Sequence, residues 1–273
     1  MTNAITPIHP LVNLMRGFAV DWLSGAHPEA CDRIMDPGYT AIVGGVALEG
    51  RDVGYKPSTL AQLERFPGLL LTVHDLFLSE DEVALHFSEH GPSIRDGHSA
   101  AWTGIGIFRW NGERLTFNVT EEDYLSRRRQ LATGEPDPVA VAAVAPWSAV
   151  PEPPDPAAEA AVRAWLDVGE LSAGGRVSID DAWTGQPTPP LLHQHGLDID
   201  TVLCAGRRVA FHATQFGTYL GGLDVPDEPV GADFRMRLIG MVSVVDPTRI
   251  AGSIVRDRVG LRRDLVDRAT PIG

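Results

Sequence analysis

Cysteine is scarce in this chain, which has only Cys31 and Cys204 among its 273 residues. The two lie in different halves and lack the close paired spacing of a zinc knuckle or a redox motif. Both are therefore expected to be reduced, buried thiols, as is usual for a cytoplasmic protein.

Positive charge is also limited. The chain carries 23 Lys and Arg residues against 36 Asp and Glu residues, which gives a net charge of −13 at pH 7. Such a balance disfavours binding to phosphate backbones and to anionic membrane surfaces. Neither nucleic acid nor a membrane is expected as a partner.

Long apolar runs are absent. Nowhere do about 18 consecutive apolar residues occur, and residues 1–18 lack a basic region followed by an apolar stretch. These features predict a cytoplasmic protein without a membrane span or an export signal.

Motifs for nucleotides and for covalent catalysis are missing as well. The glycine-containing segments 44–50 and 205–211 have the wrong spacing for a phosphate-binding loop or a dinucleotide fingerprint, and no nucleophile elbow occurs. We therefore expect no cofactor.

The sequence does contain an internal repeat. Residues 83–91 read VALHFSEHG and residues 209–217 read VAFHATQFG, which places His86 and His212 at the same position of each copy. A second anchor comes later in each copy, where EEDYLSRRRQL (121–131) aligns with RDRVGLRRDL (256–265).

This second anchor superposes Asp123 on Asp257. The offset between the copies grows from 126 to 134 residues, and a longer loop over 218–235 accounts for the difference, since surface loops absorb insertions at small entropic cost. The repeat predicts two similar structural units.

A segment rich in proline, alanine and acidic residues separates the copies and is typical of an extended linker. We predict a first domain over residues 1–133, a linker over 134–155 and an abbreviated second domain over 156–273.

Hydrophobic periodicity predicts an α+β fold for each domain. In the first domain, apolar residues recur at three- and four-residue steps over 9–24, which indicates an amphipathic helix. The other expected elements are helices over 28–35 and 56–66, a bent β-segment over 38–50, and strands over 69–79, 82–91, 99–110 and 114–123.

The second domain repeats this order in shorter form. Its expected elements are a helix over 156–171 and strands over 177–183, 191–204, 207–217, 234–246 and 249–260.

Residues 66–91, 104–118 and 123–131 resemble, in their order and spacing, the SnoaL-like polyketide cyclases of the nuclear transport factor 2-like superfamily. The resemblance covers residues 11–131 well and the second domain in part. It implies two cone-shaped domains. In each, a curved antiparallel sheet wraps around helices, and the sheet and helices enclose an apolar pocket.

The resemblance also implies a function. Its members include cofactor-independent acid/base enzymes, and we expect a cyclase, isomerase or dehydratase that acts on a small apolar metabolite of polyketide or terpenoid type. The alternatives are an epoxide hydrolase of the same superfamily and a non-catalytic ligand-binding or assembly module.

Superfamily members commonly dimerise through the outer face of the sheet. A fused tandem is therefore expected to form an intrachain pseudo-dimer with the repeated strands at the shared surface. A homodimer of whole chains is a further alternative.

His86 and His212 are candidate acid/base residues because the repeat superposes them. Against catalysis, the alternation puts Val83, Leu85 and Phe87 on the apolar face, so that His86 is expected to face a partner domain instead.

Three aspartates occupy family-like positions. For Asp123 and Asp257, the resemblance implies an acid/base role on the last strand, and the alternative is a helix cap or an arginine partner. Asp75 ends its strand, where burial in an apolar cone would raise its pKa and make it a base. Asp198 and Asp200 lie in the corresponding segment of the second domain.

The first domain departs from the ketosteroid isomerases of the superfamily, since Gly106 stands where their second acid would be and the first strand carries no acid. That reaction is not expected there. In the second domain, Asp180 and Asp181 could pair with Asp198 or Asp200, in a way that resembles the paired acids of the superfamily's epoxide hydrolases.

The remaining alternative is a zinc site built from His193, His195 and His212. The family does not generally need a metal and the flanking glycine and proline favour a loop, so no metal is predicted. The candidate catalytic residues are Asp75, Asp123, His86, Asp257, His212, Asp181 and Asp200.

Overall fold

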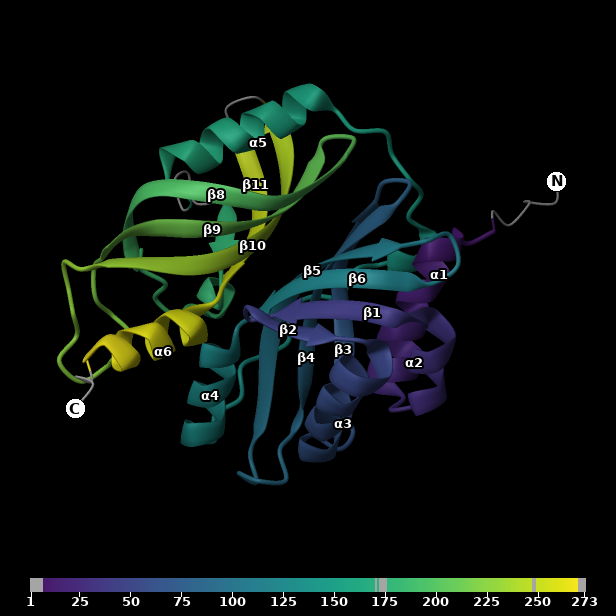
Figure 1. The fold of residues 1–273 in the computed structure, drawn as a ribbon, viewed down its shortest axis with the longest axis horizontal. Helices are drawn as coiled ribbons and strands as arrows, with labels where there is room; N and C mark the ends of the chain where they lie inside the picture. The colour runs from purple at the N-terminus through teal and green to yellow at the C-terminus, as the bar shows by residue number, and fades with distance from the viewer. Residues whose placement is uncertain (1–6, 170, 172–175, 247–248, 270–273) are drawn as a thin grey trace.

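The computed structural model describes residues 7–169, 171, 176–246 and 249–269. These residues form two β-sheets, each with helices on the face that is remote from the other sheet (Figure 1). The predicted α+β fold with two sheet-and-helix units is confirmed.

The first domain has helices at its start, a six-stranded sheet and a closing helix. Its helical elements are α1 (Pro10–Arg16), η1 (Gly17–Ser24), α2 (Pro28–Ile34), η2 (Arg51–Tyr55), α3 (Lys56–Arg65) and α4 (Tyr124–Thr133). Its strands are β1 (Met35–Val43), β2 (Val46–Glu49), β3 (Leu70–Leu78), β4 (Glu82–Pro92), β5 (Ser99–Trp110) and β6 (Leu115–Glu122).

These strands lie in the order β2-β1-β6-β5-β4-β3. Strands β3 to β6 form the expected antiparallel meander, and a parallel pairing of β1 with β6 joins the β1–β2 hairpin to it. Gly44 and Gly45 make the hairpin turn with φ of +55° and +73°, angles that glycine adopts without steric cost. The predicted bend of this β-segment is therefore a tight turn.

The first core lies between the helices and the concave face of the sheet. Leu11, Met15 and Trp22 are completely buried there, as the helical periodicity predicts. They pack in one cluster with Leu85 and Phe87 of β4, whose alternate side chains face the helices.

The second domain is shorter. Its elements are α5 (Pro156–Val168), β7 (Val177–Ile179), η4 (Ala182–Thr184), β8 (Leu192–Ala205), β9 (Arg208–Tyr219), β10 (Asp233–Asp246), β11 (Arg249–Arg256) and α6 (Arg258–Ala269). The strand order is β7-β11-β10-β9-β8, and β7 pairs in parallel with β11 as β1 does with β6. The two domains therefore share one topology around their last strand.

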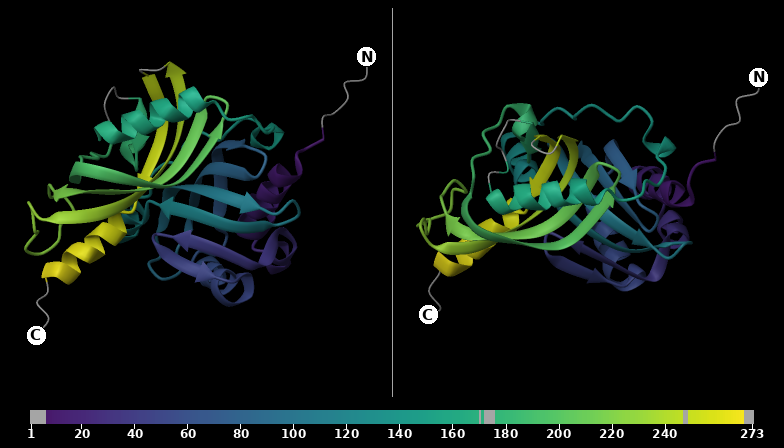
Figure 2. Two further views of the ribbon diagram at one scale, coloured as in Figure 1. Left: turned by 45° about the horizontal axis from the view of Figure 1, so that its top comes forward. Right: turned by 90° about the horizontal axis from the view of Figure 1, so that it is seen from above.

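The two sheets pack against each other through their outer faces, which lie side by side in Figures 1 and 2. One apolar cluster joins them, formed by Phe77, Ala84, Ile105, Ile107 and Val119 of the first sheet and by Leu203, Ala205, Ala210, Ile239, Met241 and Val255 of the second. The repeated strands β4 and β9 both contribute to this cluster.

The segment between the domains is held against the edge of the first sheet. Its Ala143 N–H donates to the carbonyl of Val73 at 2.8 Å, and its Glu152 N–H donates to that of Leu78 at 3.1 Å. The short helix η3 (Pro146–Ser148) lies between these contacts, and Figure 2 shows the whole segment as a long teal trace along one side. The proline-rich segment is thus an ordered connection that is hydrogen-bonded to the first sheet.

None of the helices in the described part of the chain is long and apolar enough to cross a membrane.

The apolar contact between the sheets leads to a testable expectation. Cutting the chain at residue 145 and separating the halves should expose the buried side chains of this cluster, because each half covers the other's outer face. We expect insoluble fragments or fragments that associate with one another and with themselves. Analytical ultracentrifugation checks this, and two well-behaved monomers would contradict it.

Candidate active site

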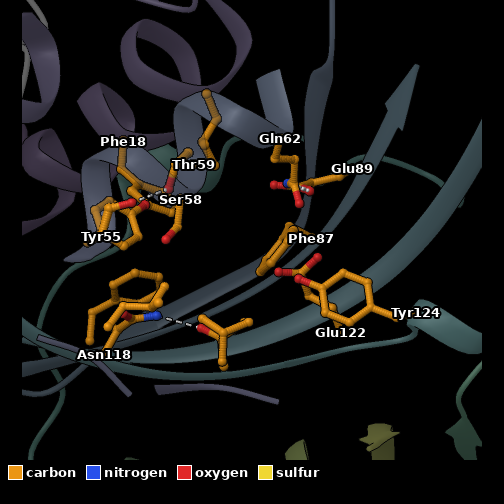
Figure 3. Close-up of a pocket in the computed structure, with 15 residues that line it drawn as sticks. Phe18, Tyr55, Ser58, Thr59, Gln62, Phe87, Glu89, Asn118, Glu122 and Tyr124 are labelled. Atoms are coloured by element: carbon orange, nitrogen blue, oxygen red, sulfur yellow. Dashed lines mark hydrogen bonds between the residues drawn. The ribbon is translucent and has the colours of Figure 1, made fainter. Parts of the chain in front are cut away.

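The first domain contains a cavity of about 150 Å³ between α3 and the concave face of its sheet (Figure 3). Phe18, Leu23, Val43, Leu48, Phe87 and Phe108 supply an apolar lining. Polar side chains lie at its two ends. An apolar lining with a few polar groups is the usual composition of a small-molecule site.

Two carboxyl groups reach this cavity because strand residues alternate between faces. On β4, Glu89 follows Leu85 and Phe87 on the inward face. On β6, Glu122 follows Asn118 and Thr120 on the inward face. Figure 3 shows both carboxyl groups beside the ring of Phe87 at one end of the cavity.

Glu122 is held by hydrogen-bond donors. The indole Nε1–H of Trp102 donates to its Oε2 at 2.7 Å, and Tyr124 is a second hydrogen-bonding partner. Burial raises the pKa of Glu122 above its usual value, while Trp102, Arg127 and Tyr124 oppose this shift because they stabilise the ionised form.

Glu89 has fewer partners and is more deeply buried, with 3% of its surface exposed. The amide Nε2 of Gln62 on α3 donates to its Oε2 at 2.6 Å. Burial raises the pKa of Glu89 well above the usual range, and the charge of Glu122 adds to the increase. Of the two acids, Glu89 therefore has the more strongly raised pKa.

Arg127 supplies positive charge behind the pair. Its guanidinium lies 4.2 Å from the ring centroid of Tyr124 and 4.9 Å from that of Trp102. Its positive charge partly offsets the increase in the pKa of both Glu89 and Glu122. Its Nη1 also donates to the side-chain Oε1 of Gln62 at 3.5 Å, so α4 and α3 are linked across the site.

The opposite end of the cavity is neutral and polar. The Tyr39 hydroxyl donates to Oδ1 of Asn118 at 2.8 Å, and the Asn118 amide donates to the Thr120 hydroxyl at 2.6 Å. Tyr55 lies near Asn118 in Figure 3. The cavity thus has two buried carboxyl groups at one end and uncharged hydrogen-bonding groups at the other, with aromatic side chains lining the space between them.

This arrangement allows acid/base chemistry. A protonated carboxyl and an ionised one, side by side in an apolar cavity, can donate a proton and accept one in the same reaction.

The repeated histidines lie at the contact between the domains. His86 bonds to the Thr103 hydroxyl at 3.0 Å, and burial lowers its pKa to about 3. Nε2 of His212 lies 3.2 Å from Oε1 of Glu121, and its Nδ1 lies 3.0 Å from Oδ2 of Asp200. Both rings are on the outer faces of their sheets, away from the first cavity.

Asp123 and Asp257 are equivalent caps. Asp123 accepts from the Ser126 N–H of α4 at 3.2 Å, and Asp257 accepts from the Gly260 N–H of α6 at 2.7 Å. Each also binds an arginine: Arg258 donates to both oxygens of Asp123 at 2.6 Å, and Arg237 donates to Asp257 at 2.6 Å. The capping and arginine-binding alternative describes both positions.

The remaining candidate aspartates also have arginine or histidine partners. Asp75 pairs with Arg208 across the domain boundary. Asp181 contacts Arg258 at 3.0 Å and Arg129 at 3.4 Å. Asp200 contacts His212 at 3.0 Å.

The imidazoles weighed as zinc ligands have other partners. His195 bonds to the Thr218 hydroxyl at 3.1 Å and packs edge-on against His193, while His212 binds the carboxylates named above. Among the described residues, no group of three or more His, Cys, Asp or Glu side chains is placed to hold a metal ion.

Sequence reasoning missed Glu89 and Glu122. The signal was present, because the alternation that puts Leu85 and Phe87 on the inward face puts Glu89 there too. The same alternation on β6 puts Asn118, Thr120 and Glu122 on one face of the strand, and all three are polar. Asp123, one residue later, ends the strand and begins the helix.

No family model and no curated protein sequence matches the chain. Solved structures do. One is described as a SnoaL-like polyketide cyclase from Jannaschia sp. CCS1, with 18% identity and a TM-score of 0.42 over 48% of this chain and 97% of that chain. Another is described as a polyketide cyclase from Acidithiobacillus ferrooxidans, with 25% identity and a TM-score of 0.41 over 48% and 99%.

A third is a hypothetical protein with a ketosteroid isomerase-like fold from Catenulispora acidiphila, in complex with trimethylamine, with 16% identity and a TM-score of 0.36 over 39% and 82%. Each match spans half of this chain or less, the length of one domain. These three solved structures are thus two polyketide cyclases and one ketosteroid isomerase-like fold by their descriptions.

Proposed function

We propose that the first domain is a cofactor-independent acid/base enzyme that moves a proton at a carbon next to a carbonyl group, on a small and largely apolar molecule of polyketide type. The observation that carries this proposal is the pair Glu89 and Glu122, two buried carboxyl groups at one end of an aromatic-lined cavity.

The environments of the two acids assign their roles. Glu122, with donors from Trp102 and Tyr124, holds the negative charge and accepts the proton from carbon. Glu89 is protonated and donates to the carbonyl oxygen as the enol forms. When Glu122 returns a proton to the same or another carbon and the enol hydroxyl returns its proton to Glu89, exchange or isomerisation is complete without any cofactor. For ring closure, the enol carbon instead attacks a second carbonyl carbon of the molecule, and the oxygen of that carbonyl takes the proton from Glu122 as the enol hydroxyl returns its own to Glu89.

The test needs no knowledge of the natural substrate. The bicyclic ketone 2-tetralone in D₂O serves as a probe, and mass spectrometry measures deuterium uptake at its carbons next to the carbonyl. We expect the protein to accelerate uptake with saturation kinetics. Uptake that stays at the buffer rate for 2-tetralone and for other apolar ketones of similar size would contradict the proposal.

The pH dependence follows from the two raised pKa values. The base Glu122 must be ionised, so the rate should rise with pH through a pKa above the ordinary glutamate value of about 4.3. The acid Glu89 must be protonated, so the rate should fall again at higher pH as Glu89 ionises. A bell-shaped profile of kcat/KM is expected, and a rate already maximal at pH 4.3 would contradict these roles.

A further inference from the structure

The second domain contains a larger cavity, of about 370 Å³. It lies at the end of α5 against the concave face of the second sheet, the face that corresponds to the one bearing Glu89 and Glu122 in the first domain. Its apolar lining includes Leu171, Ile179, Leu191 and Leu192.

Strand register identifies which residues of the two cavities correspond. In the first sheet, Glu89 pairs with Trp102 of β5, and Glu122 pairs with Gly104, two residues further on. In the second sheet, Gln215 pairs with Met236 of β10, and Arg256 pairs with Leu238, again two residues further on.

Gln215 therefore takes the place of Glu89, and Arg256 takes the place of Glu122. Both line the second cavity, and none of the described residues that line it is acidic. A cavity with an amide and a guanidinium in place of two carboxyls lacks the buried acid/base pair of the first domain, and it has gained donors for an oxygen atom. Its lining also includes His193, whose side chain is exposed.

The polar groups of this cavity are fixed in position. Two contacts of 2.7 and 2.8 Å hold the Arg256 guanidinium to Asp180, and its Nη1 donates to the Pro189 carbonyl at 3.0 Å. The Gln215 amide donates to Oε1 of Gln194 at 2.9 Å. The Arg256 hydrogen bonds use its Nε–H and one Nη1–H, so the guanidinium keeps further N–H groups for a ligand.

We infer that the second cavity is a separate, non-catalytic binding site for an apolar molecule that carries an oxygen acceptor, a carboxylate or a carbonyl, directed at Arg256 and Gln215. The acceptor meets the guanidinium, and the apolar body lies against the leucine and isoleucine side chains. This inference does not depend on the chemistry proposed for the first domain.

The test titrates the full chain with three probes of one shape: 2-naphthoate, 2-naphthamide and 2-naphthylmethylammonium. Isothermal calorimetry measures affinity, and methyl NMR shows where each probe binds. We expect the carboxylate and the amide to shift the methyl signals of Ile179 and Leu191, and the cation to bind at least tenfold more weakly.

The matched variant is Gln215→Glu, which restores the carboxyl of the first domain at the equivalent position. It should weaken 2-naphthoate binding at least tenfold by charge repulsion and weaken 2-naphthamide binding less. Glu89→Gln, the reverse change in the other cavity, should leave the shifts at Ile179 and Leu191 intact.

Three results would overturn the inference. They are shifts confined to Val43 and Leu48 of the first cavity, binding of the cation as tight as that of the carboxylate, and no binding of any probe at millimolar concentration. Each is read from affinity or shifts alone, so failure here is distinct from failure of deuterium uptake at the first domain.

Discussion

Replacing Glu122 by glutamine is expected to reduce deuterium uptake by 2-tetralone by about 10²- to 10⁴-fold, the range over which a positioned general base contributes. The substitution keeps the shape and the hydrogen bond from Trp102 but removes the charge that accepts the proton. Since the base acts in the transition state, kcat should fall with little change in KM.

The adjacent residue provides the matched control. Glu121 is also a buried carboxyl on β6, but it faces the second domain, where it contacts His212 and Arg237. Glu121→Gln should therefore retain uptake within a fewfold of the original protein. A loss of uptake as large as that of Glu122→Gln would show that the reaction does not depend on which face of β6 the carboxyl occupies.

Further substitutions separate this site from the residues that the repeat singles out. Asp75→Asn and Asp257→Asn remove carboxylates that bind Arg208 and Arg237 outside the cavity, and uptake should persist in both. If uptake instead depended on Asp75 or Asp257 while Glu122→Gln remained active, the site would lie at the domain contact.

The fold could be predicted from the sequence because its determinants are local. The apolar steps of residues 9–24 and the alternation in β4 each depend on a few neighbouring residues, and the repeat adds the second domain. The parallel pairing of β1 with β6 joins segments about 80 residues apart, and nothing in either segment alone specifies it.

The site was harder to predict because the repeat draws attention to what the two copies share. The histidine and aspartate positions are shared because both domains use them at their mutual contact or as helix caps. The catalytic candidates are the positions at which the copies differ, Glu89 against Gln215 and Glu122 against Arg256. Comparison within the chain therefore separates what holds the domains together from what each cavity does.

Arg258 is expected to be the largest single polar contributor to stability, and Arg258→Met should lower the free energy of unfolding by about 3–5 kcal/mol, as is usual when one partner is removed from a buried ion pair. Its guanidinium binds Asp123 of the first domain, and it also contacts Asp180 and Asp181 of the second. Without it, the carboxylates of this buried cluster keep fewer cationic partners.

Urea unfolding measures the loss, and Arg263→Met is the matched control. Arg263 is an exposed residue of the same helix whose Nε lies 3.6 Å from Asp264, and exposed pairs contribute about 0–1 kcal/mol. A second substitution, Asp123→Asn, should restore part of the stability in the Arg258→Met background, because it removes a buried charge that lacks its partner.

The loss should also depend on pH, with a sign set by the aspartates. Burial raises the pKa of Asp123 and Arg258 opposes that shift, so Arg258→Met should raise the pKa further in the folded state. A carboxyl whose pKa is higher in the folded state binds protons more tightly there, so the variant should regain stability relative to the original protein as the pH falls. This recovery should occur around and above the Asp123 pKa of about 7. A difference that stays constant from well above that pKa to below it would mean that Arg258 acts through packing and not through its charge.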